Sequence, residues 1–175
     1  MSSAPVRLAP FNPTAADALS IAVELAALRS TDILVDLGCG DGRVLLAAAA
    51  ACPGVRCTGY EFDPAIVERA HASLRAAAAA GGASADAAAR VAIHAGDAGA
   101  ADLSAASVVF VYLVPAGLEA VRPSLEGVLA RGGRVVSNMF KIPNAEPDET
   151  REARGLKIYL YARPLARAGV ASALR

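Results

Sequence analysis

The fold is decided by the stretch Val35-Asp36-Leu37-Gly38-Cys39-Gly40-Asp41-Gly42-Arg43. This stretch begins inside an apolar run, residues 33–37, which is continuous enough to predict a strand buried on both faces of a parallel sheet. Gly38, Gly40 and Gly42 then allow the backbone to turn tightly and let a ligand approach it closely. Residues 43–52 are predicted to form a helix whose free N–H groups point back at such a ligand. Strand, glycine turn and helix in this order predict the binding crevice of an open α/β sheet.

The spacing of these glycines distinguishes the turn from a dinucleotide-binding loop. That loop follows the pattern G-x-G-x-x-G. Here the third glycine comes one position earlier, and an acidic residue, Asp36, precedes the turn inside the strand. A pyrophosphate has no need of this carboxylate, whereas a ligand with an α-ammonium group does. The pattern therefore favours a ligand that carries an amino-acid moiety and argues against a nicotinamide dehydrogenase.

Two more acidic residues follow later strands in the same way. Glu61 ends the predicted strand 56–61, about 20 residues after Gly42, where an acidic side chain accepts hydrogen bonds from ribose hydroxyls. Asp97 follows the predicted strand 90–94, where it is placed to accept a hydrogen bond from the amino group of adenine. Because the carboxyl ends of parallel strands meet in one crevice, the three carboxylates predict a single site for an amino acid, a sugar and a base.

The rest of the chain alternates apolar runs with helical segments, which predicts βαβ units and a mostly parallel sheet. Strands are predicted at residues 33–37, 56–61, 90–94, 107–112, 134–138 and 155–162, and helices at 14–29, 43–52, from 63 to near 81, and 115–131. Thr14 is expected to cap the opening helix, and Pro123 to break or kink the last helix. Asp63 is expected to cap the helix that begins at Pro64. Residues 81–89 are predicted to be a flexible loop or frayed helix end, residues 143–155 an exposed loop, and residues 163–175 a loosely ordered tail.

Composition and charge exclude several classes of protein. The chain has 175 residues, of which 55% are hydrophobic, and this predicts one domain, residues 1–175, with a full core. Lys plus Arg equals Asp plus Glu at 17 each, and the net charge of zero argues against nucleic acid as a partner. The spacing of Cys39, Cys52 and Cys57 predicts neither a metal site nor a disulfide framework. No apolar run is long enough to span a bilayer and the first ten residues lack a signal core, so the cytoplasm is the expected compartment.

Three segments resemble the cofactor motifs of the class I, seven-strand S-adenosylmethionine-dependent methyltransferases: VDLGCGDGRV (residues 35–44), GYEFDP (59–64) and HAGDA (94–98). The resemblance implies an α/β, Rossmann-like methyltransferase fold with a mostly parallel sheet, an antiparallel last strand and helices on both faces. It also implies S-adenosyl-L-methionine as the cofactor, with Asp36 facing its methionine end, Glu61 its ribose and Asp97 its adenine. No metal is expected. The remaining predicted cofactor contacts are Gly38, Gly40, Gly42, Phe62 and Ala98 of the same motifs, together with Thr14 and Tyr112.

A narrower resemblance covers almost the whole chain. The segments that carry it are PFNPT (residues 10–14), DLGCGDGRVLLAAA (36–49), VVFVYLVP (108–115), RVVSNMF (134–140) and KIYLY (157–161). They are similar to segments of a small protein lysine methyltransferase family, which includes archaeal enzymes and mitochondrial enzymes acting on the adenine nucleotide translocase and the ATP synthase c-subunit. The resemblance implies a protein substrate that presents a lysine, and it adds the mitochondrion as a second candidate compartment. It places Phe11, Thr14, Tyr112 and Leu113 around the cofactor and the lysine channel.

Methylation of a lysine requires the free amine, although the reference pKa of lysine is about 10.4. An apolar channel beside a positively charged sulfur lowers this pKa, because both disfavour the ammonium form. Residues 112–115, Tyr-Leu-Val-Pro, suit such a channel. Tyr112 is the candidate for contact with the substrate, and no residue is identified as a general base. Methylation of nucleobases is disfavoured, because the usual Asn or Asp followed by two prolines and an aromatic is missing at this position.

Two other hypotheses stay open at this point. The same cofactor motifs serve methyltransferases that act on small metabolites or other acceptors, because function is set by the acceptor site and not by the fold. A binding module that keeps the cofactor pocket without turnover is the other hypothesis. Intact Asp36, Glu61 and Asp97 argue against such a module.

Overall fold

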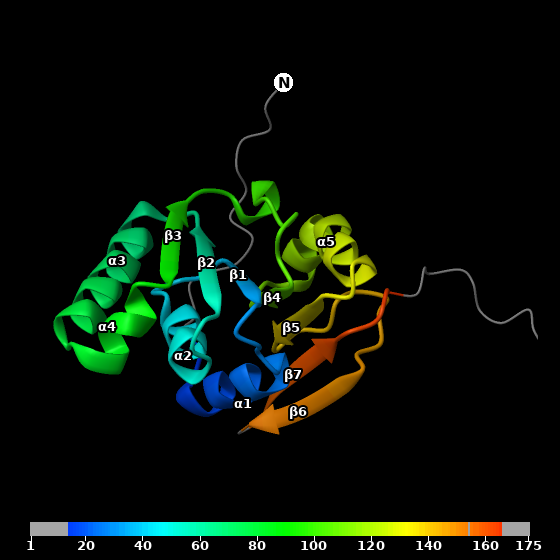
Figure 1. The fold of residues 1–175 in the computed structure, drawn as a ribbon. Helices are drawn as coiled ribbons and strands as arrows, with labels where there is room; N and C mark the ends of the chain where they lie inside the picture. The colour runs from blue at the N-terminus through cyan, green and yellow to red at the C-terminus, as the bar shows by residue number, and fades with distance from the viewer. Residues whose placement is uncertain (1–13, 154, 166–175) are drawn as a thin grey trace, which may run out of the picture.

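In the computed structural model, the described residues of the chain form one sheet of seven strands in the order β3-β2-β1-β4-β5-β7-β6 (Figure 1). The structure describes residues 14–153 and 155–165. The strands are β1 (Ile33–Leu37), β2 (Arg56–Glu61), β3 (Val91–Ala95), β4 (Val108–Val111), β5 (Arg134–Asn138), β6 (Glu149–Ala153) and β7 (Leu156–Tyr161). The helices are α1 (Ala16–Ala26), α2 (Arg43–Ala51), α3 (Pro64–Ala79), α4 (Gly82–Ala88) and α5 (Pro115–Ala130), with a 3₁₀ turn, η1 (Ala98–Ala100).

The direction of the strands confirms the predicted fold class. Neighbouring strands from β3 to β5 pair in parallel, and among the described strands only β7 runs the other way, antiparallel to both β5 and β6. The strand order reverses at β1, which lies between β2 and β4. Open α/β sheets bind their ligands at the carboxyl ends of the strands beside such a reversal. The topology therefore places a ligand site where β1 and β4 end.

Helices cover both faces of the sheet, as predicted, but unequally (Figure 1). On one face α1, α2, α3 and α4 contribute buried side chains to a core that includes Phe110. On the other face α5 packs over a core that includes Val109. The chain after β5 also covers this second face through buried Ile142, whose N–H donates to the hydroxyl of Tyr161 at 3.0 Å. Val109 and Phe110 are neighbours in β4 and point to opposite faces, because side chains alternate along a strand.

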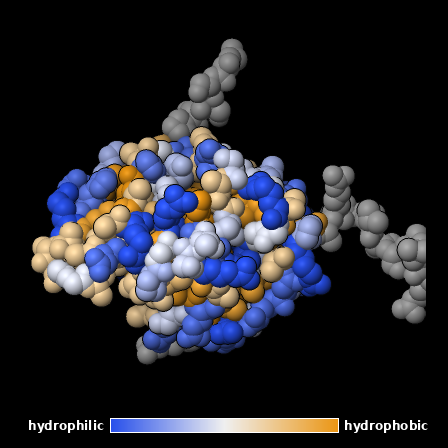
Figure 2. Space-filling model, in the orientation of Figure 1, coloured by the Kyte–Doolittle hydropathy of each residue, from blue (hydrophilic) through white to orange (hydrophobic). Residues whose placement is uncertain are grey.

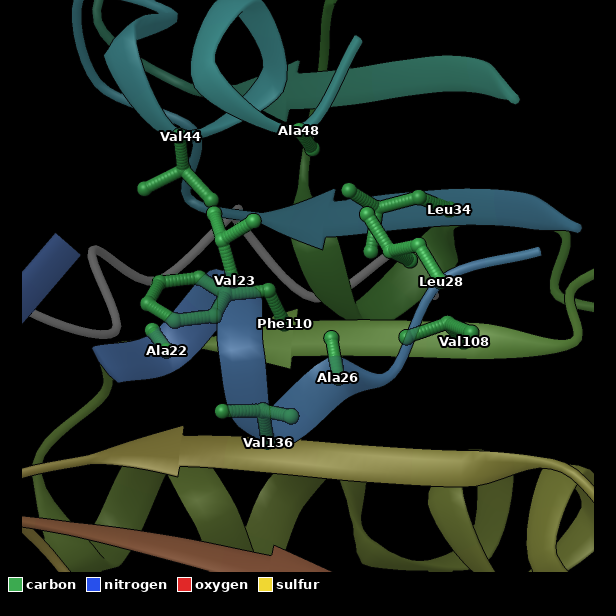
Figure 3. A pocket seen from close by; sticks show the side chains of 10 residues that line it. All are labelled: Ala22, Val23, Ala26, Leu28, Leu34, Val44, Ala48, Val108, Phe110 and Val136. Atoms are coloured by element: carbon green, nitrogen blue, oxygen red, sulfur yellow. The ribbon is translucent and has the colours of Figure 1, made fainter. Parts of the chain in front are cut away.

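A small apolar cavity of about 10 Å³ lies between α1, α2 and the sheet (Figure 3). Figure 3 shows Val108 and Phe110 of β4 and Val136 of β5 behind α1, with Val44 and Ala48 of α2 at the top of the view. Its complete lining is Ala22, Val23, Ala26, Leu28, Leu34, Val44, Ala48, Val108, Phe110 and Val136. All of these side chains are apolar, so a water molecule would find no hydrogen-bond partner among them. The cavity is therefore a gap in the packing and not a ligand site.

The exposed large hydrophobic side chains lie at one edge of the molecule. Among the described residues these are Phe62, directly after β2, and Met139, directly after β5. Figure 2 shows hydrophilic and hydrophobic side chains interspersed over the face in view. Within the described ranges, no helix combines the length and the apolar character needed to cross a membrane. The two exposed apolar side chains thus both mark the carboxyl edge of the sheet.

Residues 82–88 form the helix α4, and the prediction of a loop or frayed helix end at residues 81–89 is wrong. Gly81 and Gly82 have φ angles of 73° and 54° and make the sharp turn that separates α4 from α3. The helix packs on α2 and α3 and buries Ala87. Alanine has the highest helix propensity, and its small side chain allows close packing. The low-complexity composition of this segment thus belongs to a short helix that packs on its neighbours through Ala87 and Ala88.

Residues 149–153 form the strand β6, against the prediction of an exposed loop at residues 143–155. β6 pairs with β7 and lies at the edge of the sheet. Its sequence, Glu-Thr-Arg-Glu-Ala, is polar, as is common in edge strands, where charged side chains discourage pairing with other chains. Arg151 forms ion pairs with Glu24 of α1 at 3.1 Å and with Glu149 at 2.8 Å. A strand of this composition carries no apolar pattern by which it could be predicted.

One predicted detail of the helices is also wrong, and another is wrong in part. α1 has Ala15 as its N-cap residue and no side-chain cap, so Thr14 does not cap it. α5 is one continuous helix with Pro123 inside it, so Pro123 does not break the helix. Pro123 is on the exposed side of α5, where water can reach the carbonyl that its missing N–H leaves unpaired. The opposite side of the helix is held by buried Val121 and Leu125.

Candidate active site at the carboxyl ends of the strands

The predicted glycine turn connects β1 to α2 at the carboxyl edge of the sheet. Gly38, Gly40 and Gly42 have φ angles of 82°, 57° and 78°, in the left-handed region that glycine enters without a steric penalty. The carbonyl oxygen of Tyr60 in β2 accepts hydrogen bonds from the N–H groups of Gly38 and Cys39, at 2.9 and 3.0 Å. These bonds attach the turn to the end of β2.

Gly59 of β2 allows the turn to lie directly on the sheet. It pairs in register with Asp36 of β1. A Cβ atom at position 59 would lie 2.6 Å from both Cys39 Sγ and Leu45 Cδ1, a separation that real Cβ atoms essentially never show. The missing side chain at Gly59 therefore sets how closely the turn approaches β2.

Asp36 is the most deeply buried acidic residue of the site, with 2% of its surface exposed. Within the described part of the chain, no group donates a hydrogen bond to its carboxylate. Burial, together with the negative charges of Glu61 and Asp41, raises the pKa of Asp36 well above its ordinary value. A buried carboxylate without a cation is unfavourable. This position is therefore suited to a ligand group that brings a positive charge.

Glu61, at the end of β2, contacts the glycine turn directly. Its Oε2 accepts a hydrogen bond from the N–H of Gly40 at 3.1 Å, and its Oε1 accepts one from the N–H of Asp63 at 2.9 Å. A carboxylate has about four acceptor positions, so these bonds orient the group and leave room for hydroxyl groups of a ligand. Asp63 in turn caps α3 as predicted, since its side chain accepts from the N–H of Ala65 at 2.9 Å.

Asp97 follows β3 and lies next to this group. The N–H of Gly96 donates to the carbonyl oxygen of Glu61 at 2.9 Å, which joins the ends of β3 and β2. Asp97 Oδ1 accepts from the N–H of Gly99 at 2.8 Å and begins η1. This bond leaves the other carboxylate oxygen for a ligand. Ala98, the first residue of η1, packs against the core on the α5 side of the sheet.

Arg43 joins the glycine turn to the segment that leads into α1. Its guanidinium binds both carboxylate oxygens of Asp41, at 2.9 Å from Nε and 2.6 Å from Nη2. Its Nη1 donates to the carbonyl oxygen of Thr14 at 3.2 Å. The hydrogen bonds and charge of Arg43 hold the pKa of Asp41 below its usual range. Thr14 is buried beside the turn, and Phe11 lies outside the described residues.

The ends of β4 and β5 form the other side of the crevice. Leu113 Cδ2 lies 3.5 Å from where a Cβ of Gly38 would be, so this side chain borders the glycine turn. The hydroxyl of Tyr112 donates to Met139 Sδ at 3.2 Å. Met139 is 41% exposed and has a φ of 71°, a conformation that is strained for a side chain of this size and is common at functional sites. Asn138, next to it, is 1% exposed.

The structure therefore places the predicted residues along one edge of the sheet. Asp36 and the three glycines lie where β1 ends, Glu61 and 40% exposed Phe62 where β2 ends, Asp97 and Ala98 where β3 ends, and Tyr112 where β4 ends. Arg43, Asn138 and Met139 were not among the predicted site residues. The Asp-x-Arg spacing inside the glycine motif could have indicated the Arg43 ion pair. Residues 134–140 contribute to the family resemblance, but no pattern in the sequence gives Asn138 or Met139 a place in the site, because that place depends on burial and backbone conformation.

The site shows no arrangement for a metal or a reactive thiol. In residues 14–153 and 155–165, no group of three or more His, Cys, Asp or Glu side chains is placed to hold a metal ion. The three cysteines are free thiols, and Cys39 and Cys57 are buried. Burial raises the pKa of Cys57 to about 12. Such a thiol is protonated at neutral pH and is a poor nucleophile.

Residues 36–149 match the family model of the ANTKMT methyltransferase domain. A protein-lysine N-methyltransferase of Saccharolobus islandicus is 33% identical over 156 residues, which cover 87% of this chain and 92% of that protein. The adenine nucleotide translocase lysine N-methyltransferase of Mus musculus is 37% identical over 117 residues, 65% of this chain and 46% of the mouse protein. The chain thus spans nearly all of the archaeal relative and about half of the mouse relative.

Among solved structures, an RNA methyltransferase from Salinibacter ruber in complex with S-adenosyl-L-homocysteine has a TM-score of 0.78 and 34% identity. The match covers 90% of this chain and 97% of that one. The family model spans more than half of the chain, from Asp36 in β1 to the first residue of β6. It therefore includes the glycine turn and the three acidic strand ends described above. The chain belongs to the ANTKMT methyltransferase domain family.

Proposed function

We propose that the protein transfers a methyl group from S-adenosyl-L-methionine to the ε-amino group of a lysine in a protein substrate. The observation that carries this proposal is the similarity to the archaeal protein-lysine N-methyltransferase, which extends over 92% of that protein. A match of this extent includes the ends of β4 and β5, where an acceptor would bind, as well as the cofactor motifs. The mouse relative, which shares 37% identity, supports the same class of acceptor.

The residues of the crevice fit this cofactor. The α-ammonium group of its methionine part supplies the positive charge that buried Asp36 lacks among the described residues. The free acceptor positions of Glu61 suit the two ribose hydroxyls, and the free oxygen of Asp97 suits the amino group of adenine. Phe62 is exposed beside them and offers an apolar surface for the base. The left-handed glycines keep side chains away from the space that such a ligand needs.

When bound, S-adenosylmethionine would supply a methyl group on a positively charged sulfur. The lysine amine attacks the methyl carbon, so that the C–N bond forms as the C–S bond breaks. The protein must therefore present the amine in its neutral form. Tyr112 and Leu113 give the end of β4 an apolar and aromatic character, which disfavours a lysine ammonium group. Alignment of the amine with the methyl group then supplies much of the rate, because proximity contributes up to about 7–11 kcal/mol in such reactions.

RNA is a second candidate acceptor, because the Salinibacter relative with a TM-score of 0.78 is described as an RNA methyltransferase. The charge of the chain argues against it. Binding to RNA depends largely on Lys and Arg side chains that neutralise phosphates, and here 17 basic residues are balanced by 17 acidic ones. A protein lysine therefore remains the better-supported acceptor.

The test uses cofactor with a labelled methyl group and an extract of cells that lack the gene. Purified protein is incubated with this extract, and the label is measured separately in protein, in RNA and in small molecules. We expect the label in protein, and methyllysine in its acid hydrolysate by mass spectrometry. Asp36→Ala, which removes the proposed partner of the ammonium group, serves as the inactive control. Label confined to RNA or to small molecules would reject the proposed acceptor.

A further inference from the structure

The amide of Asn138 is buried without a partner. Asn138 is 1% exposed, and neither its Oδ1 nor its Nδ2 has a hydrogen-bond partner in the described part of the protein. The other buried atoms in this condition are the Nε atoms of Arg90 and Arg134, and both of these guanidinium groups form hydrogen bonds through another nitrogen. Asn138 thus differs from them, because its entire polar group is unpaired. Most buried polar groups in proteins are hydrogen-bonded, so such an exception requires an explanation.

The position of Asn138 in the sheet places it in the acceptor half of the crevice. It is the last residue of β5, one position beyond the Val111–Ser137 pair that joins β4 to β5, and Tyr112 is the residue that directly follows Val111 at the end of β4. It follows Val136 by two residues and therefore lies on the same face of the sheet, the face covered by α1 and α2. Met139, exposed and in contact with Tyr112, comes directly after it.

Packing alone does not account for an asparagine at this position. Its register partner on β7, Ile158, is apolar and fully buried. A leucine has a similar size and would fill the same space without burying an unpaired amide, which is unfavourable for the folded protein. An asparagine at such a place is understandable if its amide receives a partner when a ligand binds.

We propose that Asn138 Oδ1 accepts a hydrogen bond from the acceptor amine and makes Asn138 a specificity-determining residue for lysine. This inference rests on the function proposed above. Lysine fits this role, because its long unbranched chain can deliver a polar end to a buried group. Tyr112 and exposed Met139, which contact each other through the Tyr112 hydroxyl and Met139 Sδ, are the side chains that the lysine would have to separate.

A neutral carbonyl oxygen suits this reaction better than a carboxylate would. It accepts one N–H of the neutral amine and leaves the nitrogen lone pair free to form the bond to the methyl carbon. The electron pair of the broken C–S bond stays on sulfur, and the methylated nitrogen then releases one proton to water. A carboxylate at the same place would stabilise the ammonium form, whose lone pair is not available.

Three variants of the full chain test this inference: Asn138→Leu, Asn138→Asp and the matched control Ile158→Val. Each is assayed with labelled S-adenosylmethionine and the extract of cells lacking the gene, and initial rates of methyllysine formation are recorded from pH 6.5 to pH 9.5. The affinity for S-adenosylhomocysteine is measured by calorimetry, and thermal stability by circular dichroism. For Asn138→Leu we expect a rate roughly 10- to 100-fold lower, with unchanged affinity for S-adenosylhomocysteine and an unchanged or higher Tm.

Asn138→Asp keeps the size of the side chain and tests the chemistry. We expect its rate profile to shift to higher pH by about one unit, because the introduced charge favours the ammonium form, whereas Ile158→Val keeps the profile of the parent chain. Full activity of Asn138→Leu, or an unshifted profile for Asn138→Asp, would overturn the inference. So would a loss of affinity for S-adenosylhomocysteine that parallels the loss of activity, because Asn138 would then serve the cofactor.

Failure of the proposed function would be seen in the parent chain alone, as label in RNA or small molecules and none in lysine. If Asn138→Leu then abolished that transfer with unchanged affinity for S-adenosylhomocysteine, Asn138 would keep its place at the acceptor and lose its assignment to lysine. The two results are therefore distinguishable.

Discussion

Arg134 Nη2 lies 2.5 Å from Asp32 Oδ2 at the amino ends of the strands, on the opposite edge of the sheet from the crevice. The same carboxylate accepts hydrogen bonds from the hydroxyl of Ser107 at 2.7 Å and from the N–H of Arg29 at 2.8 Å. Ser107 also accepts from the N–H of Ile33 at 3.0 Å. This network ties together the starts of β1, β4 and β5, so it stabilises the frame that holds the site.

The Asp32 network predicts a loss of stability in acid. Burial alone would raise the pKa of Asp32, but the hydrogen bonds from Ser107 and Arg29 and the charge of Arg134 outweigh it, and the pKa is lowered. A carboxyl group whose pKa is lower in the folded state stabilises the protein above its unfolded pKa of about 3.9, and this stabilisation is lost as the pH falls through the folded value. We expect Asp32→Asn to lower the free energy of unfolding by about 3 kcal/mol at pH 7. Urea denaturation from pH 3 to pH 7 should show this difference shrinking below about pH 4, and a constant difference would contradict the assignment.

Asp36 predicts the opposite pH dependence. Because its pKa is raised in the folded protein, the folded state keeps a proton that the unfolded state releases above about pH 3.9. The stability of the cofactor-free protein therefore falls as the pH rises from this value through the folded pKa of Asp36. We expect Asp36→Asn to raise the Tm at pH 7 and to weaken the binding of S-adenosylmethionine by about 100-fold or more. Thermal melts and calorimetry test the two effects together. A variant that is both less stable and fully able to bind would refute the role given to Asp36.

Gly59 predicts a clash when a side chain is added. Gly59→Ala would place a Cβ 2.6 Å from Cys39 Sγ, and we expect a loss of about 1–3 kcal/mol in the free energy of unfolding. The binding of S-adenosylmethionine should weaken as well, because the glycine turn must move away from β2. Gly96→Ala is the matched control, since a Cβ there would meet no atom within 4 Å. Equal effects of the two substitutions on stability would show that contact with the turn is not the cause.

The apolar cavity under α1 predicts a stabilising substitution. Val108 lines the cavity (Figure 3). The next residue of β4, Val109, belongs to the core on the other face of the sheet. Val108→Ile adds one methylene group to this space, and we expect it to raise the free energy of unfolding by about 0.5–1 kcal/mol. Val109→Ile adds the same group to a core that does not border the cavity, and it should cost about 1–3 kcal/mol. Urea denaturation of the pair measures the difference, and the reverse order of stability would contradict this account of the packing.

The parts of the fold and site that could be predicted from sequence are those encoded in local patterns. Residues 33–37 and 56–61 were identifiable as strands from their apolar runs, and these bounds agree with β1 and β2. The glycine motif and the acidic residues after three successive strands located the crevice, because the topology of parallel sheets brings strand ends together. The Asp63-Pro64 pair likewise identified the start of α3, because the capping bond is local.

The parts that could not be predicted depend on contacts between distant residues or on burial. β6 is polar because it lies at the sheet edge, and this position is known only from the complete strand order. The bond from Arg43 to Thr14 joins residues far apart in sequence. Asn138 resembles an ordinary polar residue at a strand end until the structure shows that its amide is buried and unpaired. Such features have no sequence pattern, because they arise from the packing of the whole chain.

The charged character of β6 also bears on how the molecules behave when crowded together. An eighth strand from another molecule could reach this edge only by stripping water from Glu149, Arg151 and Glu152. That dehydration opposes the growth of the sheet into fibrous aggregates. Replacing these three residues with valine is therefore expected to leave the crevice unchanged and to make the β6 edge prone to pairing with strands of other molecules.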